Sequence, residues 1–203
     1  MKRVGIYSGT FDPVHDGHLA FAREALKQCK LDKVFFLVEP RPRRKQGVKA
    51  LEHRDEMVRL AIKDEPKFGS IMLGQQRFTA VNTLPVLQER FKGAELHMLM
   101  GDDMLAHFAD WPHVEELVNQ IQFVIGIRNH READVLKRLE IIQNTRGMAM
   151  RYKLFQAPNA EYSSREVRRQ IKKGQLPDGM SSKVLRYIEK QGLYSAVESS
   201  AKS

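Results

Sequence analysis

The feature of this sequence that most constrains the fold is a repeated alternation of short apolar runs with longer segments of helical periodicity. The apolar run Val4 to Tyr7 is followed by a glycine-bearing turn, and apolar residues then recur at helical spacing from Leu19 to Cys29. Further strands are predicted at Val34 to Val38, Ile71 to Leu73, Leu96 to Met100, Phe123 to Ile127 and Met148 to Phe155. Intervening helices are predicted at His53 to Ile62, Asn82 to Phe91 and Glu132 to Gln143. This alternation favours an α/β fold with a parallel sheet.

The last part of the chain carries two helix-start signals. Ser163 is followed three residues later by Glu166, which is typical of a capping box at the beginning of a helix. A final helix is expected to begin at Ser181 or Ser182 and to stop before Gly192. We therefore expect the chain to finish in a small helical portion.

The length and composition indicate one water-soluble globular domain. The 203 residues are 42% hydrophobic and 29% charged, and no apolar run approaches the roughly 20 residues that span a bilayer. We expect a single domain over residues 1–196, helical from about 160 to 196, and a disordered tail at 197–203. No signal-peptide hydrophobic region follows the first residues, so we expect a cytoplasmic location without membrane contact.

The net charge indicates the kind of partner, and the single cysteine limits the disulfides and metal sites that the chain can form. A net charge of +9 favours an anionic partner, but it does not distinguish nucleic acid from nucleotides or pyrophosphate. Cys29 is the only cysteine, which excludes an internal disulfide and a multi-cysteine metal site. Its place on a helical apolar stripe favours simple packing. The sequence leaves assembly into a homo-oligomer open.

The segment Gly9 to Leu19, called the opening loop below, has the features of an anion-binding site. It places Thr10, His15 and His18 between a strand and a helix, whose free N–H groups and dipole attract phosphate. Gly9 and Gly17 would allow close approach of the backbone to a ligand.

Two other interpretations of the opening loop compete with anion binding. His15 and His18, together with Asp12 or Asp16, have side chains that bind transition metals, although several ligands within one tight turn would be awkward. Alternatively, the two histidines only cap the helix. Considered alone, the segment leaves all three interpretations open.

Polar residues also follow two later strands, at Gly101-Asp102-Asp103 and at Arg128-Asn129. In open α/β sheets, ligands bind outside the carboxyl ends of the strands. We therefore expect these residues to converge with the opening loop, although Asp102 has the alternative role of capping the next helix.

Two motifs of this sequence, in the order in which they occur, resemble the signatures of a known protein family. The opening loop resembles the His-x-Gly-His signature of the nucleotidyltransferase superfamily, and Tyr162 to Arg168 resembles its second signature, of the Ser-Ser-Thr-x-x-Arg type. Further segments resemble one branch, the bacterial nicotinate-nucleotide adenylyltransferases: His53 to Ala61, Phe78 to Leu84, Gly101 to Leu105 with Trp111, and Tyr187 to Tyr194. The resemblance spans almost the whole chain.

The resemblance implies a Rossmann-like, doubly wound parallel sheet of the nucleotidyltransferase type, with a small C-terminal helical portion. It further implies adenylyl transfer from ATP to nicotinate mononucleotide, giving nicotinate adenine dinucleotide and pyrophosphate in NAD biosynthesis. The implied partners are thus ATP and a pyridine mononucleotide, and Mg²⁺ would be carried by ATP rather than by protein side chains.

Motif matching implies the residues that handle ATP. His15, His18 and Arg168 would be catalytic, contacting the phosphates and stabilising charge as pyrophosphate leaves. The other implied ATP contacts are Gly9, Thr10, Phe11, Gly101, Asp103, Ser163 and Ser164. Helix capping explains Ser163 equally well, and a solvated basic helix face explains Arg168.

For the acceptor nucleotide, the resemblance implies Thr83, Trp111 near the pyridine ring and Arg128 on the monophosphate; packing is the alternative role of Trp111. Two departures from the family pattern affect this half. Asn82 replaces the usual Asp, which removes a negative charge. This change affects whether the enzyme would prefer nicotinate or nicotinamide mononucleotide as the acceptor. The stretch Arg41 to Lys45 replaces a Pro-Pro-His-Lys-like loop and lacks its histidine, so that Lys45 is either a phosphate contact or part of a solvated loop.

Two other functions are considered. One keeps the adenylyl transfer but changes the acceptor to nicotinamide mononucleotide, phosphopantetheine or a sugar phosphate. The other is a basic nucleic-acid-binding module, motivated by the charge and by the basic runs Arg41 to Lys45 and Arg165 to Lys173. The sequence has no helix-turn-helix, zinc-finger or RNP pattern, so nucleic acid is the less favoured partner.

Overall fold

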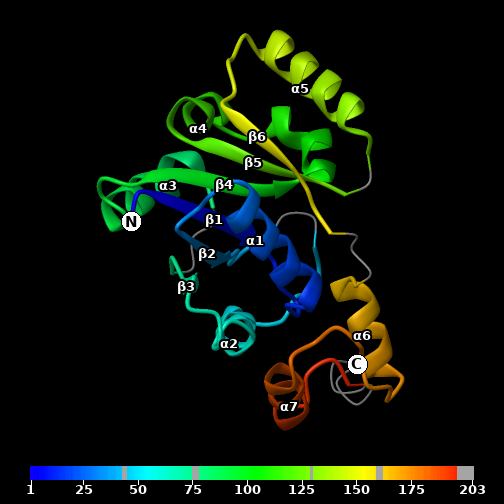
Figure 1. Cartoon of the computed structure of the whole chain (residues 1–203). Coiled ribbons are helices and arrows are strands. Elements are labelled where there is room, and N and C mark those ends of the chain that lie inside the picture. Colours follow the sequence, from blue (N-terminus) through cyan, green and yellow to red (C-terminus); the bar gives the residue numbers. More distant parts are fainter. Residues whose placement is uncertain (43–44, 75–77, 129, 159–161, 196–203) are drawn as a thin grey trace.

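The computed structural model describes residues 1–42, 45–74, 78–128, 130–158 and 162–195. Its centre is a six-stranded sheet of order β3-β2-β1-β4-β5-β6, in which all neighbouring strands are parallel (Figure 1). The strands are β1 (Arg3–Gly9), β2 (Lys33–Val38), β3 (Phe68–Ile71), β4 (Glu95–Gly101), β5 (Gln122–Ile127) and β6 (Tyr152–Gln156). This order reverses direction between β1 and β4, which confirms the predicted doubly wound α/β fold and marks the usual place for a ligand.

Helices cover both faces of the sheet. One face packs against α1 (Asp16–Gln28), α2 (Leu51–Ala61) and α7 (Ser182–Lys190). The other face packs against α3 (Ala80–Arg90), the 3₁₀ segment η1 (Asp102–Asp110), α4 (Val114–Gln120) and α5 (Glu132–Arg146). The helix α6 (Ser164–Lys172) follows β6 and precedes α7 in the C-terminal part of the described chain (Figure 1).

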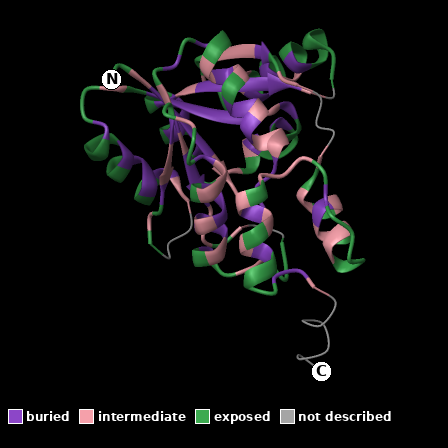
Figure 2. Cartoon of the chain, turned by 60° about the horizontal axis from the view of Figure 1, so that its bottom comes forward, coloured by how far each residue is buried: buried purple, intermediate pink, exposed green. Residues whose placement is uncertain are grey.

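The strands form because they are nearly continuous apolar runs, as expected of a parallel sheet covered on both faces. Val4 and Ile6 of β1 and Phe123 of β5 are fully buried. Figure 2 shows the buried strands at the centre and the exposed residues on the outer sides of the helices. The predicted packing role of Cys29 agrees with its burial at the end of α1.

Two predicted strands have different bounds. β3 runs from Phe68 to Ile71 rather than from Ile71 to Leu73, and Met72 is 44% exposed. Gly69 and Ser70 interrupt the apolar run that would have marked this strand, and the Ser70 hydroxyl donates a hydrogen bond to Asp55 (2.6 Å). The last strand begins at Tyr152 rather than at Met148. The 3₁₀ segment η1 and the seven-residue helix α4 were not predicted.

The C-terminal helices begin where capping residues predict. The Ser163 side chain accepts a hydrogen bond from the Glu166 N–H (3.2 Å), but the second half of the predicted capping box is wrong. The Glu166 carboxylate turns to Arg169 instead, with contacts of 2.6 and 2.8 Å. Gly192 ends the last helix with a φ of 61°, a conformation that glycine adopts without strain. The predicted tail at 197–203 lies outside the described residues.

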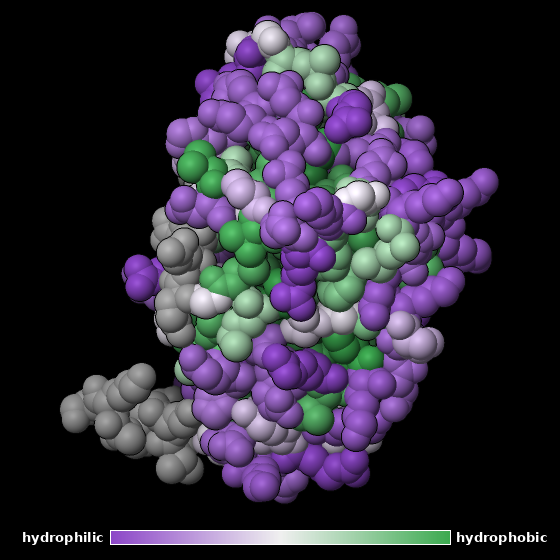
Figure 3. All heavy atoms as spheres, turned by 90° about the vertical axis from the view of Figure 1, so that its left-hand side faces the viewer, coloured by the Kyte–Doolittle hydropathy of each residue, from purple (hydrophilic) through white to green (hydrophobic). Residues whose placement is uncertain are grey.

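The surface is largely polar. Figure 3 shows a face dominated by hydrophilic residues, with hydrophobic residues gathered across its middle. Exposed large hydrophobic side chains include Met72, Val81 and Val86. In the described part of the chain, no helix combines the length and the apolar character needed to cross a membrane.

Candidate active site

The opening loop leaves the carboxyl end of β1, next to the point where the sheet reverses direction. Phe11 adopts a positive φ of 49°, and its buried ring folds back against Gly9. A Cβ atom at Gly9 would lie 2.7 Å from that ring, so only glycine leaves room for it. The loop is thus held against β1 by its own aromatic side chain.

His15 and His18 form a close pair at the start of α1, with ring centroids 3.8 Å apart. The His18 Nδ1 atom accepts a hydrogen bond from the His15 backbone N–H (3.2 Å), so neutral His18 carries its proton on Nε2. Gly17 makes space for this pair, since a Cβ there would lie 3.0 Å from the His15 Nδ1 atom. The histidines therefore do contribute to the helix start, and His18 keeps a ring N–H donor besides.

The environment of both histidines favours their neutral form. Burial, together with the nearby Arg128 cation, lowers the pKa of His15 to about 4. Burial also lowers the pKa of His18 well below its usual value, and His15, Arg128 and Lys45 lower it further. Both rings are neutral at pH 7, and an anion bound beside them would favour their protonation.

The C-terminal portion is hydrogen-bonded to the opening loop. The Ser164 hydroxyl donates to the Pro13 carbonyl (2.9 Å), and Arg168 Nη1 donates to the Asp12 carbonyl (2.5 Å). Tyr194 then donates to the Asp12 carboxylate (2.6 Å). The two motifs that lie about 150 residues apart in sequence are therefore in contact, as their pairing predicted.

Lys45 also reaches the opening loop, where its Nζ atom donates to the Thr10 hydroxyl (2.9 Å). Burial, with a smaller effect of Arg168, lowers the pKa of this lysine. The sequence interpretation placed Lys45 with the acceptor residues, whereas the structure places it beside residues assigned to ATP. Residues 43 and 44 of the same basic stretch lie outside the described residues.

Arg54 also contacts the opening loop, although no sequence motif predicts a role for it. Its side chain is only 1% exposed, and it donates to the carbonyls of Lys49 (2.8 Å), Thr10 (2.9 Å) and Glu39 (2.8 Å). It thus joins the opening loop to the segment after β2. A signal was present: Arg54 lies one turn from Leu51 and Val58, on the inward stripe of α2.

The end of β4 presents two carboxylates with different surroundings. At Gly101, a Cβ atom would collide with the Asp103 carboxylate, so the glycine lets Asp103 fold back over the strand end. Asp102 is 1% exposed, and its Oδ2 atom accepts from the backbone N–H groups of Arg128 (3.3 Å) and His130 (3.2 Å). The predicted capping role of Asp102 is therefore wrong, because its carboxylate is bound to the loop after β5.

Arg128 converges with the opening loop, as predicted from the strand ends. Its guanidinium carbon lies 4.2 Å from the centroid of the Phe21 ring, in a cation–π contact. Burial raises the pKa of Tyr7, and the neighbouring Arg128 opposes this shift by charge and by a side-chain hydrogen bond. Arg128 also lowers the pKa of both His15 and His18, which places its charge near the pair.

The remaining residues assigned to the acceptor lie on other elements. Thr83 is buried, and its hydroxyl accepts from the Thr79 N–H (3.1 Å). Asn82 is exposed in the first turn of α3, and both residues line a groove with Met72, Leu73, Gly74, Val86 and Arg90. Trp111 is half-buried after η1, with its ring centroid 5.2 Å from that of Phe108.

No metal-binding cluster supports the alternative interpretation of the histidines. In residues 1–42, 45–74, 78–128, 130–158 and 162–195, no three His, Cys, Asp or Glu side chains are placed to hold a metal ion together. Asp12 is 5% exposed, and its carboxylate accepts from Tyr194 rather than facing the histidines as a ligand set.

Comparison with known proteins agrees with this arrangement. The family model described as Cytidylyltransferase-like matches residues 6–170. The nicotinate-nucleotide adenylyltransferase of Bacillus subtilis is 33% identical over 205 residues, which cover 96% of this chain and 99% of that protein.

Solved structures support the fold. The Plasmodium falciparum nicotinic acid mononucleotide adenylyltransferase complexed with NaAD gives a TM-score of 0.75 at 20% identity, covering 96% of this chain and 98% of that chain. The same protein complexed with APC gives a TM-score of 0.73 at 19% identity and the same coverage. Together with the sequence matches, these findings show that the chain belongs to the nicotinate-nucleotide adenylyltransferase family of nucleotidyltransferase enzymes.

Proposed function

We propose that this protein transfers the adenylyl group of ATP to nicotinate mononucleotide, giving nicotinate adenine dinucleotide and pyrophosphate in NAD biosynthesis. Its membership of the family and the near-complete coverage of the Bacillus subtilis relative support this reaction. The observation that carries the proposal is the contact of Ser164 and Arg168 with the loop that bears His15 and His18. In this proposal, the two motifs joined by this contact form a phosphate clamp.

In the proposed reaction, a phosphate oxygen of the acceptor attacks the α-phosphorus of ATP. A new phosphorus–oxygen bond forms while the bond to pyrophosphate breaks, and pyrophosphate departs with its electron pair. Because no covalent enzyme intermediate is needed, the protein contributes mainly positioning and charge stabilisation.

We assign the phosphates of ATP to the clamp. The Nε2–H group of His18 would donate to a phosphate oxygen, and His15 would become a second donor as the anion raises its pKa. Arg168 and Lys45 would add positive charge beside the departing pyrophosphate. Backbone groups at Thr10 and Phe11 and the α6 start at Ser163 and Ser164 complete this set.

Gly101 and Asp103 are assigned to the adenylyl part of ATP. Asp103 is a suitable acceptor for ribose hydroxyl groups, because a carboxylate at a strand end accepts hydrogen bonds without donating any.

The acceptor half is assigned to residues on three elements. Arg128 would bind the monophosphate, and its place beside the histidines supports this role. Trp111 would lie against the pyridine ring, and Asn82 and Thr83 would supply polar contacts around it. Asn82 keeps the hydrogen-bonding capacity of the usual Asp without its negative charge, so the preference for nicotinate over nicotinamide is tested directly with both acceptors.

Mg²⁺ is proposed to arrive bound to the triphosphate. The side chains assigned to the phosphates are histidines, serines and cations, which suit phosphate oxygens better than a hard divalent cation. When bound, the ion would neutralise phosphate charge during transfer. We further propose that residues 1–196 act as one domain in the cytoplasm.

Parallel assays with different acceptors test the proposal. Pyrophosphate release is measured from ATP with nicotinate mononucleotide, nicotinamide mononucleotide or phosphopantetheine, at matched concentrations and with Mg²⁺. We expect the highest kcat/KM with nicotinate mononucleotide. Equal rates with both pyridine nucleotides would overturn the nicotinate preference, and turnover with phosphopantetheine alone would overturn the proposed substrate class.

A further inference from the structure

The three residues at the end of β4 face two different parts of the site. Gly101 and Asp103 lie on the side assigned to the adenylyl group, and the Asp103 carboxylate folds back over Gly101. Asp102 lies between them in sequence, but its carboxylate is buried against the loop that follows β5. The Gly-x-Asp motif carried by the family resemblance assigns no role to this middle position.

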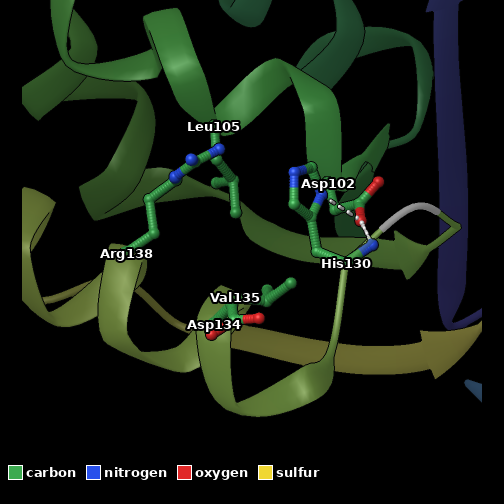
Figure 4. Close-up of a pocket in the computed structure, with 6 residues that line it drawn as sticks. All are labelled: Asp102, Leu105, His130, Asp134, Val135 and Arg138. Carbon is green, nitrogen blue, oxygen red and sulfur yellow. Dashed lines mark hydrogen bonds and ion pairs between the residues drawn. The ribbon is translucent and has the colours of Figure 1, made fainter.

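Three donors converge on one oxygen of Asp102. Its Oδ2 atom accepts from the N–H groups of Arg128 (3.3 Å) and His130 (3.2 Å) and from the His130 Nδ1 atom (2.8 Å). Figure 4 shows the His130 ring and the Asp102 carboxylate side by side, with dashed lines between them. The carboxylate therefore holds the backbone at both Arg128 and His130.

This loop carries Arg128, whose side chain is fixed independently of its backbone. The guanidinium group lies over the Phe21 ring and interacts with Tyr7. Asp102 therefore holds the backbone of Arg128 (3.3 Å), while Phe21 holds its charged end (4.2 Å). A cation fixed at both ends can meet a phosphate with little loss of side-chain freedom.

We propose that Asp102, together with His130, is a positioning residue that sets Arg128 for the acceptor monophosphate. The inference rests on the proposed function, which assigns Arg128 to that phosphate. In this proposal the end of β4 serves both substrates. Gly101 and Asp103 are assigned to ATP, and Asp102 holds the backbone of Arg128, which is assigned to the acceptor phosphate. A buried carboxylate suits this task because backbone N–H groups bind strongly to an ionised acceptor.

The test compares the KM values of the two substrates in variants of this pair. His130→Ala removes the ring donor from a partly exposed side chain, and Asp102→Asn keeps the shape but weakens the acceptor. We expect each to raise the KM for nicotinate mononucleotide on the order of tenfold, with the KM for ATP changed less than about twofold. His130→Asn keeps a donor near the carboxylate and should restore most of the loss.

A double-mutant cycle shows whether the effect passes through Arg128. If Asp102 and His130 act only by placing this arginine, then His130→Ala should have no further effect on the acceptor KM in an Arg128→Ala background. Equal effects in the two backgrounds would overturn the proposal. So would unchanged acceptor KM values in both His130→Ala and Asp102→Asn.

The control is Asp134→Asn, which makes the same chemical change in a neighbouring carboxylate. Asp134 is exposed, pairs with Arg131 (3.0 Å), and lines the same small cavity as Asp102 (Figure 4). It should leave both KM values unchanged. If Arg128→Ala itself leaves the acceptor KM unchanged, the proposed role of Arg128 fails. If Arg128→Ala raises that KM and the Asp102 and His130 variants do not, only the positioning inference fails.

Discussion

The two halves of the candidate site are built in different ways. On the ATP half, Lys45 comes from the segment after β2 and Ser164 and Arg168 come from α6, and all three bond to the opening loop. On the acceptor half, Thr83 bonds to the N-cap residue of its own helix, and Trp111 packs on a phenylalanine of η1. The residues assigned to ATP are therefore cross-linked through the opening loop, whereas those assigned to the acceptor lie on separate elements.

This difference has a physical reason. The opening loop offers backbone carbonyls as acceptors, and Arg54 and Arg168 use them to cross-link the loop to distant helices. Burial, together with the cations Arg128 and Lys45, keeps the neighbouring histidines neutral, and a bound triphosphate would neutralise the positive charge of these residues. Substitutions in the ATP half should consequently affect turnover most, and those in the acceptor half should mainly affect the KM for the acceptor.

The largest expected effect is that of His18→Ala, which removes the proposed ring donor to the phosphates. We expect kcat to fall about 10³-fold, the upper range for the loss of one preorganised donor. The measurement is steady-state pyrophosphate release, with the melting temperature as a check of folding. The matched control is His113→Asn, at an exposed histidine, which should keep near-normal turnover. His113 has a φ of 58°, a left-handed conformation that Asn tolerates. Near-normal turnover of His18→Ala would sink the phosphate assignment.

Arg168→Ala tests whether the C-terminal portion completes the ATP half. The variant loses both the bond to the Asp12 carbonyl and a cation beside the phosphates, so kcat/KM for ATP should fall about 10²-fold. Arg165→Ala, at an exposed position of the same helix, is the control and should change kcat/KM little. Equal kcat/KM values for ATP in the Arg168→Ala and Arg165→Ala variants would contradict the assignment of Arg168 to the ATP half.

Trp111→Ala tests the acceptor half. Loss of an aromatic surface for the pyridine ring should raise the KM for nicotinate mononucleotide at least about tenfold, with little change in the KM for ATP. Trp111→Phe keeps an aromatic ring and should restore much of this loss. If Trp111→Ala lowers the melting temperature but leaves both KM values unchanged, the ring only packs against Phe108.

Local sequence signals predicted the elements that place the site. The order of strands and helices follows from apolar runs and periodicity, and Ser163 is the N-cap that its motif indicated. These features depend on residues close in sequence, so a pattern can identify them. β3 was misplaced because Gly69 and Ser70 break its apolar run, although a partner on α2 accepts the serine hydroxyl.

Contacts between distant segments were not predictable in the same way. Tyr194 donates to Asp12, a residue 182 positions earlier, and the buried Arg54 guanidinium group donates to four backbone carbonyls. The Asp102 carboxylate turns from the next helix to a loop 26 residues later. Each contact depends on which carbonyls or N–H groups the completed sheet brings nearby, and periodicity carries no such information.

The smallest expected effect concerns stability at low pH, and it sharpens the account of the ATP half. Because the folded pKa of His15 is about 4 and the usual value is near 6.5, the unfolded chain binds a proton between these pH values that the folded chain does not. The native state therefore loses stability as the pH falls from about 6.5 towards 4. His15→Gln cannot bind this proton, so its free energy of unfolding should fall less between pH 7 and pH 5.5, by about 1 kcal/mol.

Urea unfolding of both proteins at the two pH values, without nucleotide, measures this difference. A general loss of helix capping in the variant lowers stability at both pH values and cancels in the comparison. A bound triphosphate should reverse the sign of this pH effect, because an anion beside His15 favours its protonated form. At fixed ionisation of the nucleotide, the triphosphate should therefore bind the wild type more tightly at pH 5.5 than at pH 7. An identical pH dependence in both proteins would mean that burial and the Arg128 charge do not hold His15 neutral in the folded protein.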